Sequence, residues 1–321
     1  MKYAKRLLAG IVLVAAIAFL GLALYRSWSG FTALLVEPGT LIAVVLLAVF
    51  YGVAFQLLFL SWFATLRARS PIRVSTRAAA SVYNISNIAK YLPGNIFHLA
   101  GRQVLGTRVG WSHAALAQAT ILEISAIVAA IAMLLLAVAA VAPDAVLSVV
   151  PWEGSLSAAT ELRRAAVLCL AIAGLIFLAL ARKGAYERLF GVAAKTVALA
   201  VALCAAFFLV NIVIAAIFAD QLTSAVDTPS ALAVGMAYIA AWLAGFAVPG
   251  APGGLGVRES VLVLLLTANG SDLAAFALGL GIGMRLISVL GDAIAAGTAV
   301  VAERLRPAPN AVAEAGGTPH G

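Results

Sequence analysis

Basic side chains stand beside two segments in which glycine and proline interrupt long apolar stretches. The first segment, 91–102, follows Lys90 directly and ends in Arg102; the second, 248–259, contains Arg258. Arginine holds phosphate through a forked pair of N–H donors, and lysine does so as a point charge. Irregular backbone at membrane depth persists only where protein or a watery cavity satisfies its polar groups. These residues therefore predict a site for an anionic lipid headgroup.

The first break is predicted to end one helix and begin another at the same depth. Pro93 lacks an N–H donor and Gly94 tolerates a positive φ, so the arriving helix should stop there. A new helix from Asn95 would present free N–H groups, and its positive dipole end attracts anions. His98 and Arg102 are four residues apart and share a face of that helix. His98 as a packing residue and Arg102 as a topological anchor are the open alternatives.

The second break has the same ingredients and leads into a helix that begins near Ser260. Its glycine spacing does not match a nucleotide-binding loop. Broken segments in both halves of a membrane protein are typical of transporter substrate sites. Arg258 and Glu259 as a local neutral pair are the alternative. The predicted substrate-binding residues are Lys90, Pro93, Gly94, His98, Arg102, Gly253, Gly254, Arg258 and Glu259.

A polar stripe precedes the first break. Ser81, Asn84 and Asn87 recur at every third position of segment 78–91, opposite apolar residues. If this segment is helical, the stripe is predicted to line a cavity. The alternative is that these side chains only hydrogen-bond to neighbouring helices, a common use of polar residues in membranes.

Three charges lie inside apolar runs: Glu123, Arg285 and Asp292. Arg285 and Asp292 are seven residues apart, so they lie about two turns apart on nearly the same helix face. An uncompensated charge at membrane depth is costly. We therefore expect Glu123 to pair with Arg285, and Asp292 to meet Lys90 or another donor; the alternative is a purely structural role for these pairs.

Composition assigns the class of fold. Of 321 residues, 64% are hydrophobic and only 11% are charged, and the apolar residues form long runs. This predicts an all-α polytopic integral membrane protein with about seven or eight transmembrane helices and one or two re-entrant or broken helices. The last span carries a G-x-x-x-G pattern, followed by further glycines, which predicts close packing against a neighbouring helix. These glycines are Gly279, Gly281, Gly283, Gly291 and Gly297. The expected spans are 7–24, 40–66, 114–141, 165–181, 196–219, 231–248 and 274–302.

The basic residues orient the chain. The net charge is +8, but nearly every Lys and Arg lies in a short connection beside an apolar segment, which favours the positive-inside rule over nucleic-acid binding. If segment 78–101 dips into the membrane and returns, almost all these residues share one side; if it crosses, they divide evenly. The re-entrant arrangement is therefore predicted, with both termini cytoplasmic. Segment 257–268 is either a short crossing or half of a second re-entrant hairpin.

The chain is expected to form one membrane domain over residues 1–302, followed by a short disordered cytoplasmic tail, 303–321. No catalytic, cofactor or metal constellation is found: Asp-x-Asp is missing, and the three histidines are scattered. Cys169 and Cys204 lie in apolar runs and are expected to be core residues. A membrane-embedded lipid-modifying enzyme, such as a transferase, and a non-catalytic partner subunit are the alternatives to a lipid transporter.

Two runs carry a family resemblance. Segment 89–94, closing with Gly101 and Arg102, and segment 251–259 resemble the signature segments of the lysylphosphatidylglycerol synthase transmembrane family. This is the flippase-type region of bacterial multiple-peptide-resistance proteins, and the resemblance covers about residues 1–302. The chain departs from the family at Asn95, where lysine is more frequent.

The resemblance implies a stand-alone lipid-translocating domain without the soluble synthase, in a bacterial-type inner (plasma) membrane. The implied partner is a phospholipid, isoprenoid or glycolipid substrate, with a homodimer or a lipid-synthesis enzyme as a possible protein partner and no nucleic acid.

Overall fold

A computed structural model describes residues 38–92, 96–149, 191–222, 229–248, 251–268 and 273–304, together with scattered residues between 161 and 188. The predicted span 7–24 and the predicted site residues Pro93 and Gly94 lie outside the described residues, as does most of span 165–181. Of the predicted tail, residues 303 and 304 still belong to the last helix, and 305–321 lie outside the described residues.

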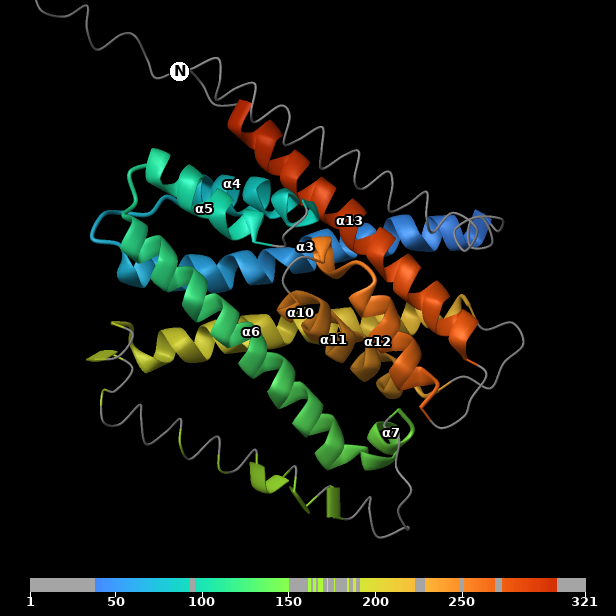
Figure 1. Cartoon of the computed structure of the whole chain (residues 1–321). Helices are drawn as coiled ribbons and strands as arrows, with labels where there is room; N and C mark the ends of the chain where they lie inside the picture. Colours follow the sequence, from blue (N-terminus) through green and yellow to red (C-terminus); the bar gives the residue numbers. More distant parts are fainter. Residues whose placement is uncertain are drawn as a thin grey trace, which may run out of the picture.

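Every regular element in the described ranges is a helix (Figure 1). In chain order these are α3 (Pro38–Arg69), α4 (Thr76–Asn87), the 3₁₀ turn η1 (Ile88–Tyr91), α5 (Phe97–Arg108), α6 (His113–Val141), α7 (Pro143–Leu147), α10 (Ala194–Asp220), α11 (Ala231–Ala247), the 3₁₀ turn η2 (Pro252–Gly254), α12 (Val257–Leu266) and α13 (Ala274–Arg304).

Four of the described helices are long and apolar enough to cross a membrane: Gly39–Arg69, His113–Val141, Ala194–Asp220 and Ala274–Arg304. They match four of the predicted spans. The predicted span 231–248 corresponds to α11, a shorter apolar helix of 17 residues. Large apolar side chains such as Leu46 and Leu264 are exposed on the outer surface, as expected where lipid replaces water. The described part of the chain is all-α, and its four long apolar helices are those of a membrane protein.

Helix α3 packs against α13, α10, α6 and α4, and α13 crosses it diagonally (Figure 1). The crossing is close because glycines face each other: a Cβ on Gly291 would lie 2.7 Å from the Ala48 carbonyl oxygen, and one on Gly52 would lie 2.9 Å from the Gly291 oxygen. The predicted close packing of the last helix is thus confirmed at Gly291. It does not extend to Gly297, which has open space around it.

The two predicted breaks form two short helical hairpins, α4–η1–α5 and α11–η2–α12, whose arms contact each other. Helices α4 and α5 have 12 residues each and lie side by side (Figure 1). Such helices are about 18 Å long, short of the ~30 Å hydrocarbon core. Neither arm alone spans a membrane, which supports the re-entrant prediction for segment 78–101. Helix α12, with 10 residues, is shorter still.

Candidate functional site

The two hairpins meet around one cavity of ≈ 50 Å³. This volume exceeds the roughly 10–15 Å³ that one water molecule needs, so a small polar group can enter. Its wall is formed by α3, α4, η1, α5, α6, α11, η2 and α12. The predicted site residues that line this basic cavity are Asn87, Lys90, His98, Arg102, Glu123, Gly253 and Arg258. Residues from both broken segments therefore share one site, as the sequence predicts.

Glycines of the second break allow the two segments to approach each other. Gly253 has φ +56°, and a Cβ on it would lie 3.2 Å from the Tyr91 ring of the first break. Gly254 has φ +75°, and its Cβ would lie 2.8 Å from the Arg258 Nε and 3.0 Å from the Gly245 Cα. Gly253 lines the cavity, whereas Gly254 does not line it but leaves the space that the Arg258 side chain occupies. These backbone conformations favour glycine over other residues.

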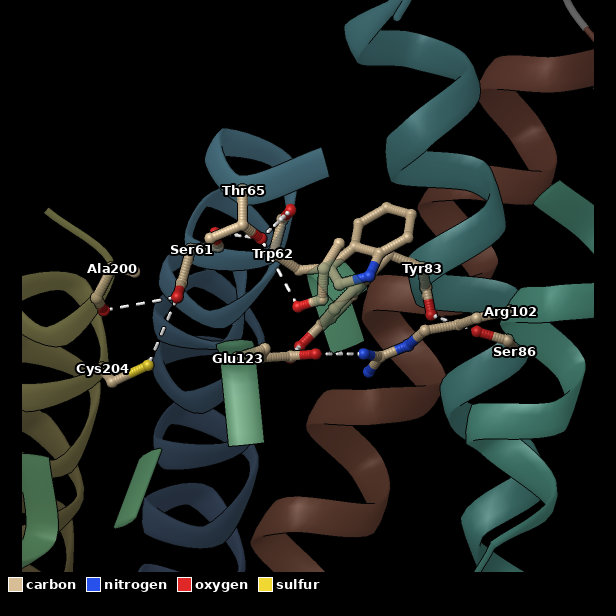
Figure 2. Close-up of polar contacts among 10 residues, drawn as sticks. Ser61, Trp62, Thr65, Tyr83, Ser86, Arg102, Glu123, Ala200 and Cys204 are labelled. Carbon is tan, nitrogen blue, oxygen red and sulfur yellow. Dashed lines mark hydrogen bonds and ion pairs between the residues drawn. The ribbon is translucent and has the colours of Figure 1, made fainter. Parts of the chain in front are cut away.

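Arg102 and Glu123 form a buried ion pair on one side of the cavity (Figure 2). Their relative exposures are 3% and 2%. Tyr83 donates a second hydrogen bond to Glu123, with 2.5 Å between its hydroxyl oxygen and Oε1. The Arg102 guanidinium lies 3.9 Å from the centroid of the Tyr83 ring and 5.7 Å from that of Trp62. Cation–π attraction is strongest in such desolvated sites.

The predicted Glu123–Arg285 pair is therefore wrong. Helix α5 packs on α6 and brings Arg102 to Glu123, while α12 packs on α13 and offers Arg285 the nearer carboxylate of Glu259. The spacing of residues along a single helix cannot predict which charges pair, because the pairing depends on which helices become neighbours.

Asp292 binds residues at the turn of the first hairpin, and its predicted pairing with Lys90 is confirmed. Lys90 Nζ lies 2.7 Å from Asp292 Oδ2, with side-chain exposures of 18% and 0%. Asn87 donates to Oδ1 at 2.9 Å, and Tyr91 donates to Oδ2 at 2.5 Å. The Lys90 ammonium also lies 5.5 Å from the Phe55 ring centroid. The role of Tyr91 was not predicted, although Asn87, Lys90 and Tyr91 have the i, i+3, i+4 spacing of one helix face.

Arg285 and Glu259 tie the second hairpin to the same helix, α13. Glu259 Oε1 lies 2.7 Å from Arg285 Nη2 and accepts from its Nε at 2.8 Å. The other oxygen, Oε2, accepts from the Gly256 N–H at 2.8 Å. Glu259 thus binds backbone at the start of α12 and does not line the cavity. Its predicted substrate-binding role has no support in this geometry, because both carboxylate oxygens face protein donors.

Arg258 differs from the other cations of the basic cavity. Within the described residues it has no carboxylate or hydrogen-bond partner, and its Nε is buried. Its guanidinium lies 5.0 Å from the centroid of the Trp242 ring. Two other buried atoms of cavity residues, Arg102 Nε and His98 Nδ1, have no hydrogen-bond partner in the described part either. Buried polar groups are nearly always paired, so a polar group that enters the cavity, water or ligand, would find donors there.

The polar stripe divides between two roles. Asn87 lines the cavity, but Ser81 donates to Glu303 of α13 at 3.0 Å, and Asn84 donates to Gln56 of α3 at 3.2 Å. Asn87 lines the basic cavity, as predicted, and Ser81 lines a separate pocket between α4 and α13. Asn84 does not line the basic cavity and bonds to a neighbouring helix, which was the alternative. A spacing of three drifts around a 3.6-residue helix, so Ser81 and Asn87 point about 120° apart.

The described residues contain no group of three or more His, Cys, Asp or Glu side chains able to hold a metal ion. Comparison of the sequence with protein-family models and with curated proteins finds no match. The resemblance to the lysylphosphatidylglycerol synthase transmembrane family stays a prediction.

Proposed function

We propose that the protein is a flippase-type lipid transporter whose basic cavity binds the phosphate of a membrane lipid headgroup. The observation that carries this proposal is the meeting of Lys90, Arg102 and Arg258 at one cavity between two broken helices. The cargo is a phospholipid or an isoprenoid or glycolipid phosphate, which share this chemistry.

The chemistry of the wall suits a phosphate. Guanidinium groups make charge-assisted hydrogen bonds that are about twice as strong as neutral ones. Arg258 supplies a cation that has no counter-charge among the described residues, and the unpaired Arg102 and His98 nitrogen atoms add polar groups. The rest of the wall is largely apolar, with Leu58 and Ile127 among the lining residues. A few convergent polar groups in an otherwise apolar wall are typical of small-molecule sites.

The position of the cavity suits an amphiphile. It lies where the first hairpin, whose 12-residue arms are too short to cross a membrane, and the second hairpin meet helices that are long enough to do so. A lipid bound there would place its phosphate on the basic residues and its tails in the surrounding bilayer, along the apolar surfaces of the spanning helices.

The proposed topology is multi-pass with both termini cytoplasmic, in a bacterial-type inner membrane. Broken helices at a substrate site are a feature of transporters that alternate access by rocking of two halves. We extend that mechanism to this chain by analogy.

Transport can be tested with purified protein in liposomes that contain a fluorescent phosphatidylglycerol. An impermeant reductant then bleaches only the outer leaflet, so lipid movement appears as loss of the protected fraction. Arg258→Gln removes one charge-assisted bond, about 1.5–3 kcal/mol, which corresponds to a roughly tenfold to hundredfold slower movement at low lipid concentration. The matched control is Arg108→Gln, an exposed arginine on α5 that does not line the cavity.

The proposal predicts wild-type movement for Arg108→Gln and slow movement for Arg258→Gln. Wild-type protein that moves no phosphate-bearing lipid, or an Arg258→Gln variant that binds and moves phosphatidylglycerol at the wild-type rate, would contradict it.

A further inference from the structure

We infer that the basic cavity selects a phosphodiester headgroup with a net charge of −1 over a dianionic phosphomonoester and over a phosphodiester whose own cation brings the net charge to zero. This inference rests on the proposed function and adds the charge class of the substrate.

The charges at the cavity leave a net value of +1. Three cations line it: Lys90, Arg102 and Arg258. Lys90 is paired with Asp292 and Arg102 with Glu123, whereas Arg258 has no carboxylate partner in the described ranges. The nearby Arg285–Glu259 pair contributes no net charge.

His98 does not add a second positive charge to this count. It lies one helical turn from Arg102 on α5, with a relative exposure of 6%. Like charges four residues apart on a helix repel each other, and burial removes the water that would screen them. A neutral imidazole keeps one donor and one acceptor for a ligand.

One anion therefore neutralises the site. A phosphodiester brings a single charge shared by two unesterified oxygens, which can face the Arg258 and Arg102 guanidinium groups. A second charge on the same phosphate would have no partner at a depth where unpaired charges are costly. The phosphate of a zwitterion would neutralise the net charge of +1, and the zwitterion's own cation would then lack a carboxylate partner among the described residues of the site.

The contacts of the Arg258 side chain leave N–H donors for a ligand. Its guanidinium carbon lies over the Trp242 ring, and Gly245 and Gly254 lie beside its stem and Nε. A cation–π contact is an attraction to the ring face and makes no hydrogen bond, so it leaves the guanidinium N–H groups for an acceptor. The side chain is thus held for a ligand by contacts that supply no counter-charge.

Calorimetric titration of the detergent-solubilised full chain tests the inference with three short-chain lipids at pH 8. Dihexanoyl phosphatidylglycerol carries one charge, dihexanoyl phosphatidic acid is mainly dianionic, and dihexanoyl phosphatidylcholine is zwitterionic. We expect phosphatidylglycerol to bind at least about tenfold more tightly than phosphatidylcholine, and phosphatidic acid to bind no more tightly than phosphatidylglycerol.

Variants connect the preference to one residue. Arg258→Gln should bind phosphatidylglycerol and phosphatidylcholine with similar affinity, whereas Arg258→Lys, which keeps the charge, and the control Arg108→Gln should keep the preference. If Arg258→Gln does not fold, the Arg258→Lys variant and the three-lipid comparison on wild-type protein still decide the matter.

Tighter binding of phosphatidic acid, or equal binding of phosphatidylcholine, would overturn the charge selection but leave lipid transport standing. Wild-type protein that binds none of the three lipids, and moves none in liposomes, would overturn the proposed function itself.

Discussion

Replacing the whole buried cluster of Tyr83, Arg102 and Glu123 by apolar residues of similar size should cost less stability than removing Glu123 alone. The triple variant is Tyr83→Phe, Arg102→Met and Glu123→Leu, and the single variant is Glu123→Leu. All three side chains are at most 3% exposed and bond mainly to one another. The comparison separates the energetic role of the cluster from its role in binding.

The magnitudes follow from what each variant leaves behind. Glu123→Leu strands the Arg102 guanidinium in a buried site, which costs about 3–5 kcal/mol. It also leaves the Tyr83 hydroxyl without an acceptor, which adds about 1–3 kcal/mol. The sum, about 4–8 kcal/mol, rivals the whole stability of a typical domain. The triple variant strands no polar group and should lie within about 2 kcal/mol of the wild type.

The free energy of unfolding can be measured by titration with sodium dodecyl sulfate in mixed micelles, followed by circular dichroism. We expect the triple variant to recover most of the loss, and yet to bind dihexanoyl phosphatidylglycerol poorly, because Arg102 lines the cavity. A triple variant as unstable as Glu123→Leu would refute the reasoning that desolvated charge dominates this cluster. A triple variant that binds the lipid like the wild type would remove Arg102 from the site.

Three further comparisons use the same unfolding measurement. Gly291→Ala should lower the free energy of unfolding by about 1–3 kcal/mol through overpacking, because the new Cβ would lie 2.7 Å from the α3 backbone. Gly297→Ala has open space around it and should leave the stability unchanged or raise it. Equal effects of the two variants would contradict the close crossing of α13 and α3. Lys90→Met leaves the Asp292 carboxylate, with 0% exposure, without its cation and should lower the free energy of unfolding by about 3–5 kcal/mol. Asp292→Asn should cost less, because the Lys90 ammonium that it leaves is 18% exposed. The reverse order would show that water reaches the carboxylate. Gly254→Ala should cost at least about 1–2 kcal/mol because of its positive φ and should weaken lipid binding, and unchanged binding would separate this glycine from the site.

The helices and the breaks were predictable because each has a strong local cause. A run such as 40–66 contains no charge and is long enough to span a bilayer, so α3 follows from composition alone. Proline and glycine mark the breaks for equally local reasons, namely a missing N–H donor and access to positive φ. Since both breaks carry basic residues, their meeting at one cavity could also be anticipated from the sequence.

The pairing of charges could not be predicted in the same way. From the sequence, several cations could have paired with Glu123. Its pairing with Arg102 instead of Arg285 depends on which short helix packs on α6. Glu259 was expected at the ligand but binds the Gly256 N–H and Arg285. These outcomes depend on helix neighbours that a single sequence does not specify. Only Lys90 with Asp292 was anticipated, because both needed a partner at depth.

The ion pairs of α13 explain how two irregular segments keep a fixed geometry. Asp292 binds the first hairpin through Lys90, and Arg285 binds the second through Glu259, with the two α13 residues about 10.5 Å apart along the helix. Both hairpins are thus fixed to one straight support, and the Gly253–Tyr91 contact joins them directly.

Fixed segments lower the cost of binding, because the basic groups are already ordered when the ligand arrives. On this reasoning the glycine-rich segment 251–256 is not itself the phosphate cradle. Its glycines let the backbone approach Gly245 and Tyr91 closely enough to seat Arg258 against Trp242. A side chain at Gly254 would displace the one cavity cation that lacks a protein counter-charge in the described residues. The motif therefore acts on the ligand through the arginine that it positions.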